Sequence, residues 1–173
     1  MWLFIALSWL PSTALAAPAQ PQPLKQLDWL VGGVWTADAS QLPGGLKRIE
    51  TRYRYAADKC LIRFTTEFIA ASGAAVNRYA GDVYYDAPSN RLEMWYISSE
   101  NEITQGTIAL NGDGWQFAFE SPGAIVGKNG LVNFHTDVLH PSADAYQWKL
   151  SAEDGSAWKP VFALTYVRTP EAS

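Results

Sequence analysis

The chain has 173 residues, a formal net charge of −4 at neutral pH and an aromatic content of 13%. Charged residues make up 17% of it, below the average of about 25%. Phosphate binding needs a concentrated excess of Lys and Arg, so this balance excludes nucleic acid as a partner. Disorder needs few aromatic residues and a high charge, so the composition instead indicates one folded domain with a substantial core.

The first part of the chain has the pattern of a secretory signal peptide, predicted over residues 1–16. An apolar run over residues 2–10 is followed by the small residues Ala14-Leu15-Ala16, which fit a cleavage site. No Lys or Arg precedes the run, and a buried N-terminal helix is the alternative interpretation. The run is too short for a stable membrane anchor. We expect an exported protein, periplasmic or secreted, with a proline-rich spacer over residues 17–23 and a folded domain over residues 24–170.

The folded domain begins with LKQLDWLVGGVWTAD, residues 24–38. An apolar turn runs into Gly32-Gly33, where the backbone can bend sharply, and Trp35 follows on a strand. This order predicts a short helix that closes one end of a barrel. Gly, Pro, Asn and Asp separate the later segments, and such short links join antiparallel neighbours. The predicted strands cover residues 34–39, 47–56, 60–69, 78–86, 91–98, 103–110, 115–120, 131–139, 145–152 and 158–168.

Alternation with a period of two assigns one apolar face to most of these strands. One-sided strands in up-and-down order cannot leave two long edges bare, so the sequence predicts an all-β fold, a single closed antiparallel barrel of about ten strands. The residues predicted to face inward include Ile49, Thr51, Tyr53, Tyr55, Ile62, Phe64, Thr66, Phe68, Leu92, Met94, Tyr96, Trp115, Phe117, Phe119, Tyr146, Trp148, Leu150, Trp158, Phe162, Leu164 and Tyr166.

Two motifs at the ends of the domain resemble a known group of barrels. Gly33-Val34-Trp35 looks like the Gly-x-Trp signature of lipocalins and the wider calycin group. Arg168, at the end of LTYVR, is similar to the late calycin Arg that packs over that Trp. The mature chain also resembles bacterial exported lipocalin-like domains of unassigned function, through LDWLVGGVWTAD, RIETRYRY, MWYISSENEITQG and ALTYVR. This resemblance implies a barrel with an internal cavity and brings no reaction with it.

The favoured function is therefore the binding of a small, mainly apolar molecule inside the barrel. Apolar inward faces would supply affinity through the area removed from water, and a few polar groups would orient the ligand. Gln105 and Thr107 form a polar pair within a strand that could point into the cavity, where the buried amide of Gln105 would need a partner from the protein or from a ligand. The predicted lining residues are Tyr53, Phe64, Thr66, Met94, Tyr96, Gln105, Phe117 and Trp148.

Two alternatives come from other classes of protein. A barrel enzyme of the isomerase or cyclase type would need an internal carboxylate or His, for which Glu67, Asp82 and His135 are the candidates. A filled barrel would act through its outer surface on another protein, which an exposed apolar patch would favour. The chain has no Ser-His-Asp or Cys-His arrangement and no phosphate-binding glycine loop, so we assign no catalytic residue.

Metal and cofactor sites have weak signals. His135 and Asp137 share one face of a strand, but a solvated or hydrogen-bonded pair explains them better than a metal site with so few ligands. Nitrobindin-like barrels, which are similar in outline, bind haem through a late His. Residues 158–168 contain none, which leaves His135 as the only fallback ligand, and we predict no cofactor. Glu100 and Glu102 are expected at an exposed hairpin tip.

Overall fold

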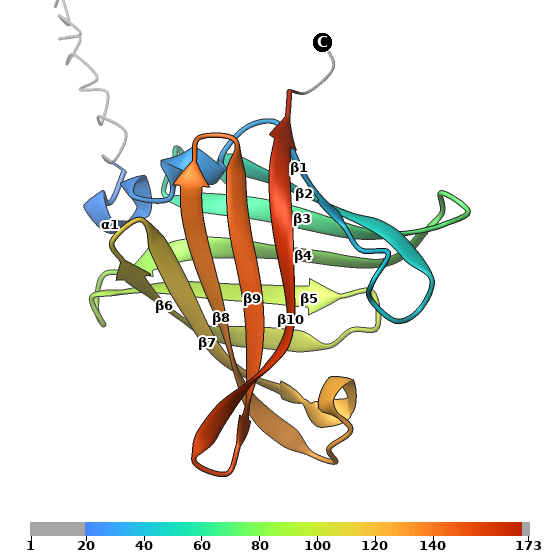
Figure 1. Cartoon of the computed structure of the whole chain (residues 1–173). Coiled ribbons are helices and arrows are strands. Elements are labelled where there is room, and N and C mark those ends of the chain that lie inside the picture. The colour runs from blue at the N-terminus through green and yellow to red at the C-terminus, as the bar shows by residue number, and fades with distance from the viewer. Residues whose placement is uncertain (1–19, 171–173) are drawn as a thin grey trace, which may run out of the picture.

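The computed structural model describes residues 20–170, which form a closed antiparallel barrel (Figure 1). Each strand pairs with its neighbours in sequence, and the first strand also pairs with the last, so the predicted up-and-down barrel is confirmed. The strands are β1 (Val34–Asp38), β2 (Leu46–Ala56), β3 (Leu61–Ala70), β4 (Ala75–Asp86), β5 (Arg91–Ser98), β6 (Ile103–Asn111), β7 (Gly114–Pro122), β8 (Leu131–Ser142), β9 (Ala145–Asp154) and β10 (Ala157–Thr169).

The helix α1 (Gln22–Lys25) starts inside the segment predicted as a proline-rich spacer. Proline is tolerated in the first turn of a helix because the N–H it lacks has no partner there, so Pro23 does not prevent the turn from forming. The predicted signal peptide over residues 1–16 lies outside the described residues. Within residues 20–170, none of the helices is long and apolar enough to cross a membrane.

One end of the barrel is closed by α1 and the 3-10 helix η1 (Asp28–Leu30), as the glycine-turn motif predicted (Figure 1). Three leucines from this segment, Leu24, Leu27 and Leu30, are at most 1% exposed and join the main apolar core. The carbonyl of Leu30 accepts a hydrogen bond of 2.8 Å from the indole Nε1 of Trp35. This bond satisfies the only polar atom of a large buried side chain and fixes the plug to β1.

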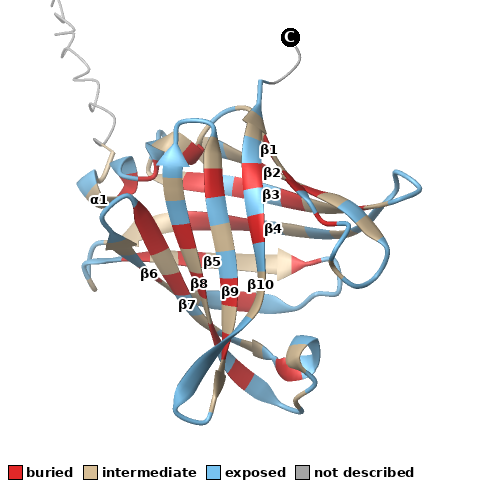
Figure 2. Ribbon diagram, in the orientation of Figure 1, coloured by how far each residue is buried: buried red, intermediate tan, exposed pale blue. Residues whose placement is uncertain are grey.

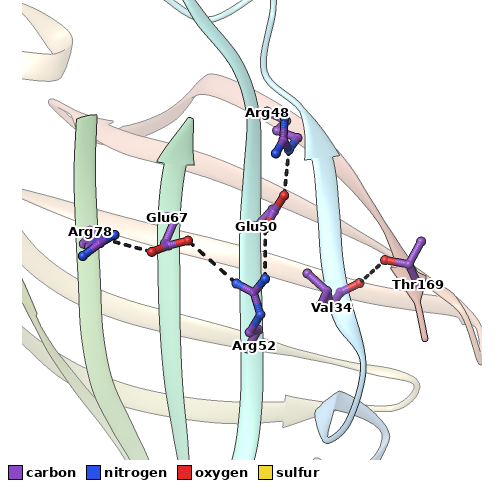
Figure 3. Close-up of polar contacts among 7 residues, drawn as sticks. All are labelled: Val34, Arg48, Glu50, Arg52, Glu67, Arg78 and Thr169. Carbon is purple, nitrogen blue, oxygen red and sulfur yellow. Dashed lines mark hydrogen bonds and ion pairs between the residues drawn. The ribbon is translucent and has the colours of Figure 1, made fainter. Parts of the chain in front are cut away.

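The first and last strands meet at Trp35 and Arg168, as the sequence predicted. These residues are direct partners in the pairing of β1 with β10, and the guanidinium carbon of Arg168 lies 4.4 Å from the centre of the Trp35 ring. The Arg168 Nη2 also donates to the carbonyl of Trp29 in η1. On the same seam, the hydroxyl of Thr169 donates to the carbonyl of Val34 at 3.1 Å (Figure 3). The arginine therefore connects the closing strand, the opening strand and the plug.

Buried and exposed residues alternate along the strands (Figure 2), and most of the buried apolar residues belong to one main core. Charged side chains on the outer face of β2, β3 and β4 form a ladder (Figure 3). Glu50 pairs with Arg48 at 2.7 Å and with Arg52 at 3.1 Å, while Glu67 pairs with Arg52 at 3.8 Å and with Arg78 at 2.9 Å. The basic residues of β2 are therefore partly neutralised by neighbouring carboxylates on a solvated face.

The prediction that Trp158 faces inward is wrong. Trp158 is 48% exposed, and its ring centre lies 4.2 Å from that of His135 on the outer surface. The register of β10 against β9 shifts between Pro160 and Phe162. A bulge of this kind inserts one extra residue into a strand. The residues of β10 before it therefore face the opposite side from the one that strict alternation with Phe162 predicts. Phe162, Leu164 and Tyr166, which follow the bulge, line the interior as predicted.

Candidate functional site

The barrel encloses a cavity of about 400 Å³. Leu27 and Leu30 of the plug segment line its closed end. The other end, called the mouth here, is lined by Glu100 and Glu102 of the β5–β6 loop and by Ile125 of the 3-10 helix η2 (Gly123–Val126). In Figure 1, η2 lies on the opposite side of the barrel from α1. A volume of this size falls within the range of small-molecule sites, which is about 300–1,000 Å³.

Seven of the eight residues predicted to bind a ligand line this cavity. They come from five different strands, β2, β3, β5, β7 and β9, which the closed topology brings around one space. Aromatic rings dominate the middle of the cavity, where Phe64 and Tyr96 lie 6.2 Å apart between ring centres and Tyr96 and Phe117 lie 6.5 Å apart. The seven residues are Tyr53, Phe64, Thr66, Met94, Tyr96, Phe117 and Trp148.

The expectation that Gln105 points into the cavity is wrong. Gln105 is exposed, and neither it nor Thr107 lines the cavity, whereas Thr104 is 5% exposed. In β6 the inward positions are Thr104, Gly106 and Ile108, and the apolar Ile103 is 69% exposed. The strand therefore places a threonine inside and an isoleucine outside, the reverse of the usual pattern.

The three residues on which the enzyme hypothesis depended lie on the outside of the barrel. Glu67 belongs to the charged ladder, and the carboxylate of Asp82 pairs with Arg63 at 2.8 Å. His135 pairs with Asp137 at 3.2 Å on the face opposite the buried Phe134 and Thr136. None of these side chains is among those that line the cavity. The enzyme hypothesis therefore loses its internal acid or base.

The positions of the histidines and carboxylates also decide whether the barrel can hold haem or a metal ion. In the described part of the chain neither His135 nor His140 lines the cavity, and His135 is on the outer face, so the residues present do not fit a histidine-ligated haem in the interior. Within residues 20–170, no group of three or more His, Cys, Asp or Glu side chains is placed to hold a metal ion. Away from Glu100 and Glu102 at the mouth, the described residues that line the cavity carry aromatic rings, aliphatic groups and hydroxyls.

A group of tyrosine and threonine hydroxyls forms the polar part of the interior. Burial raises the pKa of the Tyr53 phenol to about 12, against an opposing hydrogen bond from Tyr146. Burial also raises the pKa values of Tyr146 and Tyr166 far above the ordinary tyrosine range. The hydroxyls of Thr51 and Thr66 lie 3.0 Å apart. At neutral pH these groups are uncharged, and they can both donate and accept hydrogen bonds.

Several lining residues were not identified from the sequence. Phe68 was recognised as inward-facing but not as a site residue, and Tyr79 was not assigned a face, because β4 carries aromatic and small residues on both sides. Tyr79 lies 4.9 Å from Phe68 and 5.1 Å from Tyr96 between ring centres. Glu100 and Glu102 are exposed, as expected for a hairpin tip, but this tip lies at the mouth of the cavity. The position of this hairpin tip at the mouth depends on how the barrel closes, and the local sequence pattern does not predict it.

Comparison with known proteins supports the architecture. No protein-family model and no curated protein sequence matches the chain. Among the solved structures that match is the crystal structure of Rv2717c from M. tuberculosis, with a TM-score of 0.56 and 15% sequence identity over 87% of this chain and 99% of that chain. At this identity the likeness shows the fold alone.

Proposed function

We propose that this chain is an exported, lipocalin-like protein that binds a small, mainly apolar molecule in its barrel. The observation that carries the proposal is the cavity of about 400 Å³, lined mostly by aromatic and aliphatic side chains and open at the mouth. Such a lining offers affinity through burial of apolar area, at about 25 cal/mol per Å². The uncharged hydroxyls of Tyr53, Tyr146 and Tyr166 add a few polar contacts, as small-molecule sites commonly have.

Support for export comes from the N-terminal sequence, with its apolar run, small-residue cleavage pattern and proline-rich continuation. The lipocalin-like assignment is supported by Trp35 and Arg168, which carry the motif resemblance and pack on each other at the seam of the closed barrel.

Blocking the cavity should abolish binding. Ile108 lines the cavity, and Ala109, the next residue of β6, is exposed on the outside. The variant Ile108→Trp places an indole where a ligand would lie, so we expect at least a tenfold loss in affinity for the neutral fluorescent probe N-phenylnaphthylamine, which is roughly 1.4 kcal/mol. Fluorescence titration measures this affinity.

The matched control is Ala109→Trp, which adds the same ring to the outer face and should leave the affinity unchanged. Thermal unfolding of both variants, with Met94→Trp as a second cavity-filling change, separates blocked binding from a lost fold. A folded wild-type protein that gives no saturable probe signal would overturn the proposal, as would a folded Ile108→Trp variant that binds as tightly as the wild type.

A further inference from the structure

The charged residues that line the cavity are all negative. Among residues 20–170, no Lys, Arg or His lines the cavity, and Glu100 and Glu102 are the only charged residues that do. Both belong to the loop between β5 and β6 at the mouth, and their backbone N–H groups donate to the hydroxyl of Ser98 at 3.2 and 3.3 Å. Hydrogen bonds from both residues to one buried serine restrict the loop and keep the two carboxylates near the mouth.

Neither carboxylate is neutralised by the protein. In the part of the chain that the structure describes, the carboxylates of Glu100 and Glu102 form no ion pair with Lys, Arg or His. Elsewhere on the barrel the carboxylates of Glu50, Glu67 and Asp154 each have a basic partner. Two unpaired negative charges therefore lie at the entrance to an otherwise apolar space.

Aromatic rings continue inward from these carboxylates. Phe68 and Tyr79 meet edge to face with an angle of 65° between rings, and Tyr79 stacks on Tyr96 at 26°. Burial raises the pKa of Tyr79, and the charges of Glu102 and Glu100 raise it further, so both carboxylates act on this ring. A cation is attracted to the face of an aromatic ring and to a carboxylate by the same electrostatics.

We propose that the ligand is a lipophilic cation, with an apolar body inside the barrel and an ammonium group at the mouth between Glu100, Glu102 and the ring of Tyr79. This inference rests on the proposed function and narrows it to one ligand class. A fatty acid fits poorly, because its carboxylate would meet two negative charges and no basic lining residue. A neutral apolar molecule gains nothing from this arrangement.

Calorimetric titration with decyltrimethylammonium, decanol and decanoate, below their aggregation concentrations and at low salt, tests the inference. These probes share one chain and differ in headgroup charge. We expect the cation to bind about tenfold more tightly than decanol, within the range of cation–π and carboxylate contacts. Decanoate should bind most weakly. Added salt should reduce the preference, because the mouth is exposed to solvent.

The double variant Glu100→Gln, Glu102→Gln should lower the affinity for decyltrimethylammonium to within about twofold of the affinity for decanol. The two carboxylates that attract the cation are then replaced by neutral amides, and contacts of exposed charges are worth no more than about 1 kcal/mol. Its affinity for decanol should not change. The control Asp58→Asn, Asp144→Asn removes the same charge from two exposed turns and should keep the preference. Equal binding of cation and decanol by the wild type, or a preference that survives the glutamate changes, overturns the inference and leaves the proposed function standing. Failure of all three probes to bind overturns both.

Discussion

Replacement of Trp35 by alanine should cost about 4 kcal/mol in the free energy of unfolding, within the range for removing a buried Trp. The side chain is fully buried and packs on Tyr146, with 4.9 Å between ring centres. Its loss also leaves the carbonyl of Leu30 without its 2.8 Å hydrogen bond and removes the ring beneath Arg168. Since small domains are stable by about 5–15 kcal/mol, this change removes a large part of the total.

Denaturant unfolding measures the effect, with Trp158→Ala as the matched control. Trp158 is 48% exposed on the outer surface, so its removal should cost less than about 1 kcal/mol. Trp35→Phe keeps an aromatic ring but loses the indole N–H, and it should cost about 1–3 kcal/mol through the unsatisfied carbonyl. Equal costs for Trp35→Ala and Trp158→Ala would contradict the role of Trp35 as the residue that joins plug and seam.

The second large effect is expected at Gly81, in the middle of β4. A Cβ atom built there would come closer than 3.0 Å to the carbonyl oxygen of Trp95 and to the Cα and Cβ atoms of Tyr96 on the neighbouring strand. The carbonyl oxygen and the Cα atom belong to paired backbone, and the Cβ atom is fixed to it, so none of them can move without disturbing the pairing of β4 with β5. Gly81→Val should therefore destabilise the fold by about 3 kcal/mol, at the upper end of overpacking costs.

Ala80 provides the control for that substitution, because it is the preceding residue of β4 and is exposed on the outer face. Ala80→Val should change the free energy of unfolding by less than about 0.5 kcal/mol. If Gly81→Val were tolerated as well as Ala80→Val, the close approach of β5 to this glycine would be disproved. The comparison requires only a denaturation curve for each variant.

The sequence predicted the barrel because most strands alternate strictly. In β2, β3, β7 and β9 the apolar residues recur at every second position, and turn residues punctuate the links, so both the sidedness and the antiparallel order follow from local chemistry. The contact between the first and last strands was also predictable, because Trp35 follows a glycine turn on the first strand and Arg168 ends the last strand, as in the calycin motif that they resemble. Both are partners across β1 and β10.

The errors have equally specific causes. Trp158 was placed inside because strict alternation was carried through a segment where the register shifts between Pro160 and Phe162. Gln105 and Thr107 were placed inside as a polar pair within β6, a strand with apolar residues on both faces whose pattern does not show which face is buried. The register of β6 is decided by pairing with β5, where Tyr96 lies opposite Thr104.

The cavity itself could not be read from the sequence. Alternation tells which side chains face inward, but the unfilled volume depends on the shear and tilt of the closed sheet. The position of the two glutamates at the mouth also depends on the geometry of the closed sheet. Glu100 and Glu102 lie in a short polar loop, and only the closed barrel brings that loop beside Phe68 and Tyr79. The sequence therefore predicted the seven lining residues on regular strands better than it predicted the entrance.

The binding of a small apolar molecule inside the barrel is tested most directly at Met94. Met94 lines the cavity, and the chain has two methionines, the other being Met1, so methyl-labelled methionine gives an NMR signal that reports on the interior. Titration with decanol should shift the Met94 methyl resonance in a saturable way, because the ligand would contact that methyl group. A Met94 resonance that stays unchanged in folded protein, at decanol concentrations that saturate the calorimetric signal, would contradict binding inside the barrel.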